Sequence, residues 1–344
     1  MVQCSTLSHS RNATNMFRRP SLPTHFPELL TKTFEAAVKS GDLIYTESTQ
    51  ESATDNGVDV RYTFAPALAK KPTKDDNNGD EKTEKPKFNP FEKPDPKLML
   101  VPDFGDYSLV LNKFAIVPNH FMCISKKVIP QTAPLTPNDL EYSYAALQAA
   151  QSDGAKYIGF FNCGPNSGAS VDHKHIQFIE LPKDFTPFPE SVIKAKGRDY
   201  KPGQQPLSSE KVPFAHFIVP WEAEWAEEDA KADNDTEVAI EDPVAEELGF
   251  KFSTVLSRVL TELRVNDAPS ISYNVVFTDK WVMAVPRSKE SYKDISVNAT
   301  GTVGLLLAKS QEQLDIFKEE TPLKVLTELG FVKPEEEEHP EYDY

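Results

Sequence analysis

The chain carries the stretch FFNCGPNSGASVDHKHIQFIELP at residues 160–182. Apolar residues at its two ends indicate two strands, and the small and polar residues 163–170 between them indicate a turn. Side chains alternate between the two faces of a strand, so His173, His175 and Gln177 are expected to project from one face. Two histidines and an amide on one strand face, directly after a turn of small residues, form a candidate site.

The spacing of these residues by itself leaves three interpretations open: a catalytic group, part of a metal site such as zinc, or a pair of hydrogen-bonded structural histidines. The turn favours catalysis, because the backbone N–H groups and serine hydroxyls of GPNSGAS at 164–170 can surround an anion such as phosphate. A neutral imidazole is also a good nucleophile toward phosphorus. Lys70, Lys71 and Lys113 are candidates to neutralise a polyphosphate.

Other motifs with a known chemistry are missing from the sequence. It contains no GxGxxG, GxxxxGK[ST] or HExxH motif, so the nucleotide-binding and zinc-protease chemistries of those motifs have no support. It also contains no CxxC pair, which argues against a structural zinc site. We interpret His120 and His216 as structural histidines.

The segments on either side predict the fold class. Strands and helices intermix without a regular βαβ alternation, which favours the α+β class with a mostly antiparallel sheet flanked by helices. Strands are expected at 58–64, 98–102, 107–118, 120–125, 156–162 and 171–182, with a two-strand unit at 271–287. Helices are expected at 27–41, 135–151, with Thr136 or Asn138 as its cap, and 244–264.

The composition is that of a globular protein of one or two domains, with 344 residues, of which 39% are hydrophobic and 26% are charged. No apolar run approaches the roughly 20 residues that span a bilayer, so no membrane association is expected. The three cysteines Cys4, Cys123 and Cys163 cannot form a disulfide framework, which favours a reducing compartment.

The net charge of −16 comes from two segments. Residues 222–247 hold twelve acidic residues and one basic residue, and residues 334–344 hold six acidic residues and no basic one. Without a broad basic surface, binding to nucleic acid is not expected. A small anionic substrate remains compatible, because the rest of the chain is close to neutral.

The organisation expected along the chain has four parts. Residues 1–26 form a disordered N-terminal extension, 27–200 an N-terminal half with the histidine site, 201–332 a C-terminal half that completes the nucleotide pocket, and 333–344 an acidic tail. The expected location is the cytoplasm, with the nucleus as an addition. Residues 1–25 contain three arginines and no acidic residue, so a mitochondrial transit peptide is the alternative interpretation.

The segment HKHIQ at 173–177 resembles the HxHxQ signature of the histidine-triad superfamily, in the branch that transfers nucleotidyl groups. Further segments are similar to the fungal-type diadenosine tetraphosphate (Ap4A) phosphorylase family. The resemblance covers roughly residues 27–330, and it implies a histidine-triad-like fold with two related halves in one compact unit. The segments that carry it are ALAKKP (67–72), LNKFAIVPNHF (111–121), PLTPNDL (134–140), VPFAHF (212–217), YNVVFTDKWVMAVPR (273–287) and ISVNATGTVGLLLAK (295–309).

The resemblance implies a reversible phosphorolysis, in which Ap4A and phosphate give ATP and ADP. His175 would be the nucleophile and form an adenylyl-histidine intermediate, while a main-chain carbonyl near His173 would hold its other ring nitrogen. Gln177 can hydrogen-bond a phosphate oxygen but cannot act as a general base. Ionised phosphate needs no base, whereas water does, so slow hydrolysis is expected.

The resemblance also implies substrate contacts at positions that match the family motifs. These positions are Lys71, Asn112, Lys113, Asn162, Gly168, Ala169, Ser170, Asn274, Trp281 and Arg287. The expected partners are dinucleoside polyphosphates, ATP, ADP and phosphate, and the expected state is a monomer or a weak homo-oligomer. No tightly bound cofactor and no dedicated metal site are expected; a divalent cation such as Mg²⁺, bound with the substrate phosphates, is the one cofactor left open.

Two further functions stay open at this point. One is a related dinucleoside polyphosphate hydrolase or a uridylyltransferase-like nucleotidyltransferase that uses the same histidine. The other is a nucleotide-sensing protein that binds without catalysis. The intact HKHIQ segment argues against the second, since a protein that only binds needs no nucleophile.

Overall fold

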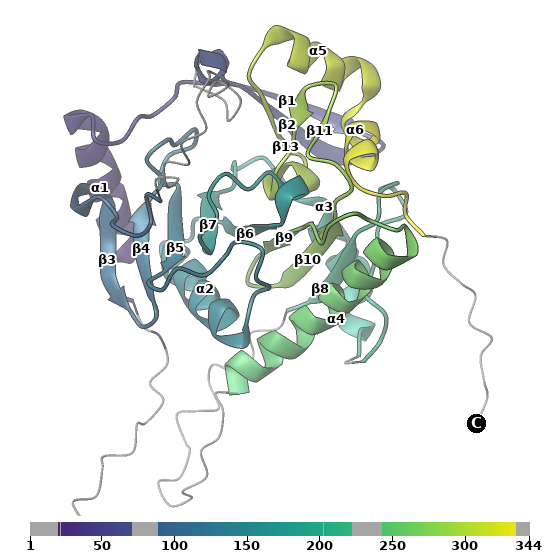
Figure 1. Cartoon of the computed structure of the whole chain (residues 1–344), viewed down its shortest axis with the longest axis horizontal. Coiled ribbons are helices and arrows are strands. Elements are labelled where there is room, and N and C mark those ends of the chain that lie inside the picture. The colour runs from purple at the N-terminus through teal and green to yellow at the C-terminus, as the bar shows by residue number, and fades with distance from the viewer. Residues whose placement is uncertain (1–19, 21, 71–88, 202, 222–242, 335–344) are drawn as a thin grey trace, which may run out of the picture.

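The chain folds around one large antiparallel sheet flanked by helices (Figure 1). The computed structural model describes residues 20, 22–70, 89–201, 203–221 and 243–334. The expected α+β class with a mostly antiparallel sheet is confirmed. Within the described ranges, no helix combines the length and the apolar character that crossing a bilayer requires.

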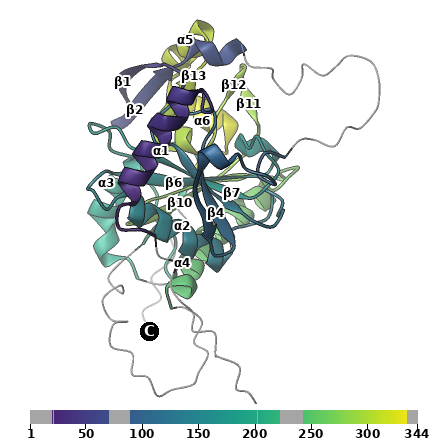
Figure 2. The same ribbon diagram turned by 90° about the vertical axis from the view of Figure 1, so that its left-hand side faces the viewer.

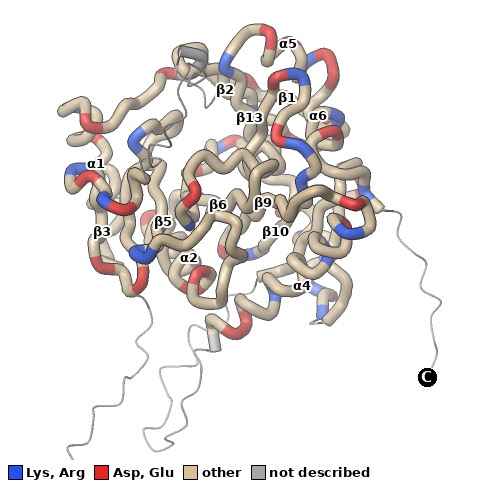
Figure 3. The backbone as a smooth tube through the Cα atoms, in the orientation of Figure 1, with Lys and Arg blue, Asp and Glu red and all other residues tan. Residues whose placement is uncertain are grey.

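The large sheet has eight strands in the order β3-β4-β5-β7-β6-β9-β10-β8, and all neighbouring pairs are antiparallel. The neighbouring strands β6, β9 and β10 contain no acidic or basic residue and are tan in Figure 3, which suits strands covered on both faces. The strands are β3 (Met99–Phe104), β4 (Tyr107–Leu111), β5 (Phe121–Ser125), β6 (Tyr157–Cys163), β7 (His175–Glu180), β8 (Phe217–Pro220), β9 (Tyr273–Phe277) and β10 (Trp281–Pro286).

Two units of the same topology share this sheet. The first is β5, helix α2 (Pro137–Ala150), β6 and β7; the second is β8, helix α4 (Pro243–Val265), β9 and β10. They meet where β6 pairs with β9 and Asn162 lies directly opposite Asn274. The two related halves that were expected therefore form one continuous sheet.

Each face of the sheet has its own hydrophobic core. Helices α1 (Phe26–Ser40), α2 and α4 cover one face, which receives Ile176 and Phe178 of β7. The other face packs against a three-stranded sheet and the C-terminal helices, at the top of Figures 1 and 2. Because strand residues alternate, His175 and Gln177 point toward this second layer. Its elements are β1 (Thr49–Asp55), β2 (Val58–Phe64), β13 (Leu305–Ala308), α3 (Phe188–Lys196), α5 (Gln311–Glu320), α6 (Pro322–Leu329) and the hairpin β11 (Ser291–Tyr292) and β12 (Ile295–Ser296).

Two strands are shorter than the sequence predicts. The strand expected at 107–118 ends at Leu111, because the Asn112 side chain accepts a hydrogen bond from the Phe114 N–H and turns the chain. The strand expected at 171–182 begins only at His175, because the Lys174 N–H donates to the Ile129 carbonyl in a neighbouring loop. The expected helix at 135–151 is confirmed as Pro137–Ala150, with Thr136 as its cap.

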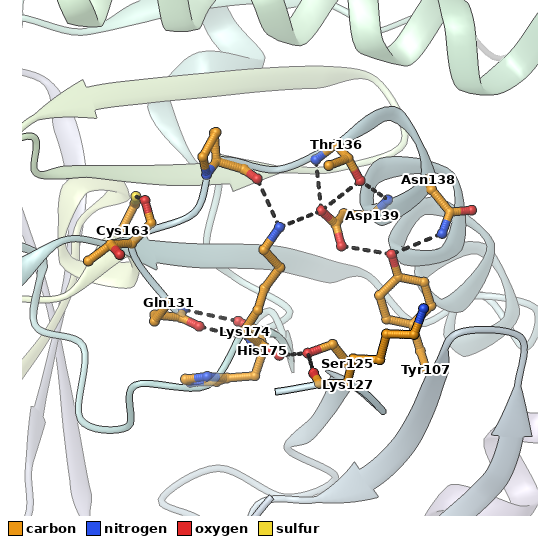
Figure 4. Close-up of polar contacts among 12 residues, drawn as sticks. Tyr107, Ser125, Lys127, Gln131, Thr136, Asn138, Asp139, Cys163, Lys174 and His175 are labelled. Carbon is orange, nitrogen blue, oxygen red and sulfur yellow. Dashed lines mark hydrogen bonds and ion pairs between the residues drawn. The ribbon is translucent and has the colours of Figure 1, made fainter. Parts of the chain in front are cut away.

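A buried ion pair anchors the chain between the two histidines (Figure 4). The Lys174 ammonium lies 2.8 Å from the Asp139 carboxylate on α2, and both side chains are almost fully buried. The carboxylate also accepts hydrogen bonds from the Tyr107 hydroxyl and from the Thr136 hydroxyl and N–H. Lys174 points to the helix-covered side of the sheet, so this network fixes the strand from the face opposite His175.

We expect Asp139→Ala to lower the free energy of unfolding by about 3–5 kcal/mol, because it leaves the Lys174 ammonium buried without a counter-charge. Urea unfolding followed by circular dichroism measures the change. Asp103→Ala is the control, since Asp103 pairs with Lys126 at the surface and should contribute far less. Equal shifts in the two variants would show that the buried pair has no anchoring role.

Candidate active site

His175 is the first residue of β7, and its ring is held in one protonation form. Its side chain is 3% exposed, and its Nδ1–H donates to the His173 carbonyl oxygen over 2.7 Å. This bond confirms the main-chain carbonyl expected near His173. Because Nδ1 carries the proton, the lone pair lies on Nε2.

Burial keeps the His175 imidazole neutral. Desolvation lowers the pKa of the His175 ring to about 4, against the opposing effect of the hydrogen bond to the His173 carbonyl. The ring is therefore uncharged at neutral pH, which a nucleophilic nitrogen requires.

His173 has both ring nitrogens engaged. Its Nε2–H donates to the Ser125 carbonyl oxygen over 2.7 Å, and its Nδ1 accepts from the Asn89 side-chain amide at 2.9 Å. The Phe91 ring packs against both histidines, with its centroid 5.0 Å from that of His175. His173 is thus a fixed support, and of the two histidines only His175 presents a lone pair for reaction.

Gln177 connects the nucleophile to a second histidine. Its Nε2 lies 3.5 Å from Nε2 of His175, and its Oε1 lies 3.1 Å from Nε2 of His120. An amide oxygen only accepts, so His120 carries its proton on Nε2 and orients the Gln177 amide with its NH₂ toward His175. The structure therefore places His120, for which the sequence indicates a structural role, at the site.

Asn112 completes this chain of side chains. Its amide nitrogen lies 3.3 Å from each ring nitrogen of His120. Burial lowers the pKa of the His120 ring to about 4, so this histidine is also neutral. It therefore orients the Gln177 amide through a hydrogen bond and adds no charge to the site. Asn112 was expected to contact substrate; in this structure its amide lies against His120.

The turn after β6 is shaped by its glycines and serine. Gly164 and Gly168 have φ of 87° and 79°, and the Ser167 hydroxyl donates to the Gly164 carbonyl over 2.7 Å. A Cβ at Gly168 would lie 3.1 Å from Asn298, so the turn approaches that backbone closely. Ala169 and Ser170 follow, and Ser170 is exposed.

Three of the expected contact residues form a buried hydrogen-bonded group that holds this turn through the Ser167 carbonyl. Asn274 donates to Oδ1 of Asn162 over 2.9 Å and to the Ser167 carbonyl over 2.8 Å. Arg287 donates over 2.6 Å to Oδ1 of Asn274 and to the Val297 carbonyl. Asn162, Asn274 and Arg287 are at most 2% exposed, so the structure brings them together as a buried scaffold.

Trp281 and Lys113 have hydrogen-bond partners outside this turn. Trp281 is fully buried, and its indole N–H donates to Glu190 over 3.1 Å. Lys113 is exposed, and its carbonyl accepts from the Ile44 N–H. Lys71 lies outside the described residues.

A cavity of about 230 Å³ reaches the site at His120 and Gly168. It extends between the three-stranded sheet and residues 296–301. Two basic side chains line it: Lys309, and Arg61, whose guanidinium lies 2.8 Å from the exposed Asp184 carboxylate. Among the residues that the structure describes, no three His, Cys, Asp or Glu gather as metal ligands.

Two family models match the chain. One is described as the Ap4A phosphorylase N-terminal domain and matches residues 17–193; the other is described as the ATP adenylyltransferase C-terminal domain and matches residues 210–332. Diadenosine 5',5'''-P1,P4-tetraphosphate phosphorylase 2 of Saccharomyces cerevisiae is 34% identical over 333 residues, which cover 90% of this chain and 96% of the yeast protein. Protein APA1 of the same yeast is 30% identical over 343 residues, covering 94% of this chain and 100% of that protein.

Solved structures of a yeast enzyme have the same fold. The crystal structure of yeast Ap4A phosphorylase Apa2 in complex with Ap4A matches with a TM-score of 0.74 and 31% identity, covering 90% of this chain and 98% of that chain. The complex of the same enzyme with AMP also has a TM-score of 0.74, with 30% identity over 91% of this chain and 98% of that chain.

We expect the His175 ring to show no titration between about pH 5.5 and 8, because its pKa is lowered to about 4. Nuclear magnetic resonance of protein with ¹³C- and ¹⁵N-labelled histidine measures this, and the nitrogen shifts should assign the proton to Nδ1 of His175 and to Nε2 of His173. A His175→Asn variant identifies the signal. A midpoint near the ordinary value of ~6.5 would contradict the account of a buried neutral ring.

Proposed function

The chain belongs to the Ap4A phosphorylase family, and on this premise we propose that it transfers an adenylyl group from Ap4A to inorganic phosphate through an intermediate on His175. The chain is a nucleotidyltransferase. In the proposed reaction the products are ATP and ADP. The observation that carries the proposal is the buried, neutral His175, whose proton is fixed on Nδ1 and whose lone pair is on Nε2.

In the first step Nε2 of His175 attacks the α-phosphorus of one adenylyl group. A nitrogen–phosphorus bond forms, the bond from that phosphorus to the bridging oxygen breaks, and ATP leaves. The ring becomes positively charged in this intermediate. The hydrogen bond from Nδ1 to the His173 carbonyl favours a charged ring, so it supports the step.

In the second step an oxygen of inorganic phosphate attacks the same phosphorus from the side opposite the histidine. The nitrogen–phosphorus bond breaks, ADP forms, and His175 returns to its neutral form. Phosphate is already ionised at neutral pH, so this step needs no general base. Dividing one displacement into two makes each easier, because imidazole is both a good nucleophile and a good leaving group.

Gln177 suits a phosphate acceptor better than a water acceptor. Its NH₂ faces His175, so it can donate to an oxygen of the transferring phosphoryl group. The amide cannot remove a proton from water, and the neutral His120 behind it donates its Nε2–H to the amide oxygen. Hydrolysis of the intermediate is therefore slow compared with phosphorolysis.

Two basic side chains line the cavity, Arg61 and Lys309, beside one acidic side chain, Glu180. Lys309, and Arg61 if it exchanges its Asp184 partner for substrate, would compensate phosphates that lie beyond the reacting one. A divalent cation would enter with the substrate phosphates, since Mg²⁺ is commonly held by phosphate oxygens and water.

Product analysis tests the proposal. With Ap4A the protein should release ATP and ADP only when phosphate is present, as measured by anion-exchange chromatography. His175→Asn keeps a donor toward the His173 carbonyl but removes Nε2, so turnover should fall by at least about 10³-fold.

His216→Asn is the matched control. His216 is equally buried, and its Nδ1–H donates to the Phe214 carbonyl over 2.8 Å, but it lies directly before the edge strand β8 of the other half. This variant should keep its activity. ATP and AMP formed rapidly without phosphate would instead identify a hydrolase, and full activity in His175→Asn would exclude this residue as the nucleophile.

A further inference from the structure

Strands β6 and β7 separate where they reach the site. They pair from Tyr157 and Glu180 as far as Phe160 and Gln177. The same register would continue with Phe161 opposite Ile176 and then Asn162 opposite His175. Both strands continue in the sheet beyond this point, but only with their outer neighbours: β6 pairs with β9 and β7 pairs with β5. The separation is therefore local and lies at the nucleophile.

The side chain of Gln131 fills this gap (Figure 4). Its Oε1 accepts from the His175 N–H over 2.9 Å, and its Nε2 donates to the His175 carbonyl at 3.2 Å and to the Asn162 carbonyl at 3.0 Å. One side-chain amide thus contacts the backbone of both strands in the way that a peptide group of an inserted strand would.

Gln131 is itself held in place. It is 2% exposed and lies in the loop between β5 and α2. Its backbone N–H donates to the Asp172 carboxylate over 2.9 Å, so the loop is tied to the chain just before the histidines. The site requires an amide that donates and accepts, because a carboxylate can only accept and an apolar side chain can do neither.

We propose that Gln131 is a positioning residue for the reaction: its amide keeps β6 and β7 apart and fixes the backbone of His175, so that Nε2 faces the phosphorus in line. This inference rests on the proposed function of the site. Without the amide, the free backbone groups of Asn162 and His175 are left to pair with each other, which moves the imidazole. A displacement of about 1 Å at a reacting group can cost roughly 10²-fold in rate.

The variant Gln131→Glu tests the positioning role through the pH dependence of kcat, because only the protonated glutamate can make the hydrogen bonds of the amide. In Gln131→Glu the protonated acid still accepts from the His175 N–H and donates to the Asn162 carbonyl, whereas the ionised form places an anion against two carbonyl oxygens. Burial raises the pKa of such a carboxyl well above its ordinary value of ~4.3. The ratio of kcat for the variant to kcat for the wild type should therefore fall as pH rises from about 5.5 to 8.5.

Two variants complete the experiment. Gln131→Met keeps the length of the side chain without hydrogen bonds, so kcat should fall by about 10²-fold while KM changes little. Gln148→Glu, at an exposed position on α2, is the control for the added charge and should give a ratio that does not depend on pH. Circular dichroism at each pH verifies that the proteins compared are folded.

The outcomes separate the two proposals. A wild-type protein that shows no phosphorolysis in this assay overturns the proposed function. With an active wild type, a folded Gln131→Glu protein whose ratio stays flat, or a folded Gln131→Met protein with unchanged kcat, overturns the positioning role. If Gln131→Met does not fold, the pH profile of Gln131→Glu decides by itself.

Discussion

The hydrogen bond from Nδ1 of His175 to the His173 carbonyl is the constraint on which the site depends. A buried imidazole has two neutral forms, and only the form with its proton on Nδ1 presents Nε2 as a nucleophile. The surrounding contacts fix the position of His175 and keep its ring neutral. The Lys174–Asp139 pair holds the strand from one face, the bonds of His173 to Ser125 and Asn89 hold the preceding residue, and burial keeps the ring neutral.

The joining of the two halves supplies the other part of the site. Because β6 and β9 are neighbours, Asn162 and Asn274 face each other, and Arg287, directly after the next strand β10, donates to Asn274. This buried group holds the 163–170 turn through the Ser167 carbonyl. The C-terminal half thus contributes the position of the turn and part of the cavity lining, including Lys309, while the nucleophile and its partners come from the N-terminal half.

The sequence predicted the α+β class, the antiparallel sheet and the lone pair on His175, because alternation along a strand and a recognisable motif are local signals. It indicated only a structural role for His120 and no role for Gln131. These residues lie 55 and 44 positions before His175, and only the packing of β5, β6 and β7 brings them to the site. Trp281 and Arg287 illustrate a second limit. A motif match located them correctly in the second half, but it could not show that both side chains are buried.

The most direct test of the account is to trap the intermediate. The protein is incubated with Ap4A without phosphate, kept at alkaline pH to preserve the nitrogen–phosphorus bond, digested, and analysed by mass spectrometry. We predict one adenylyl group on His175 for each ATP released, and its conversion to ADP when phosphate is added. An enzyme that forms ATP and ADP without any adduct, or with an adduct on another residue, would contradict it.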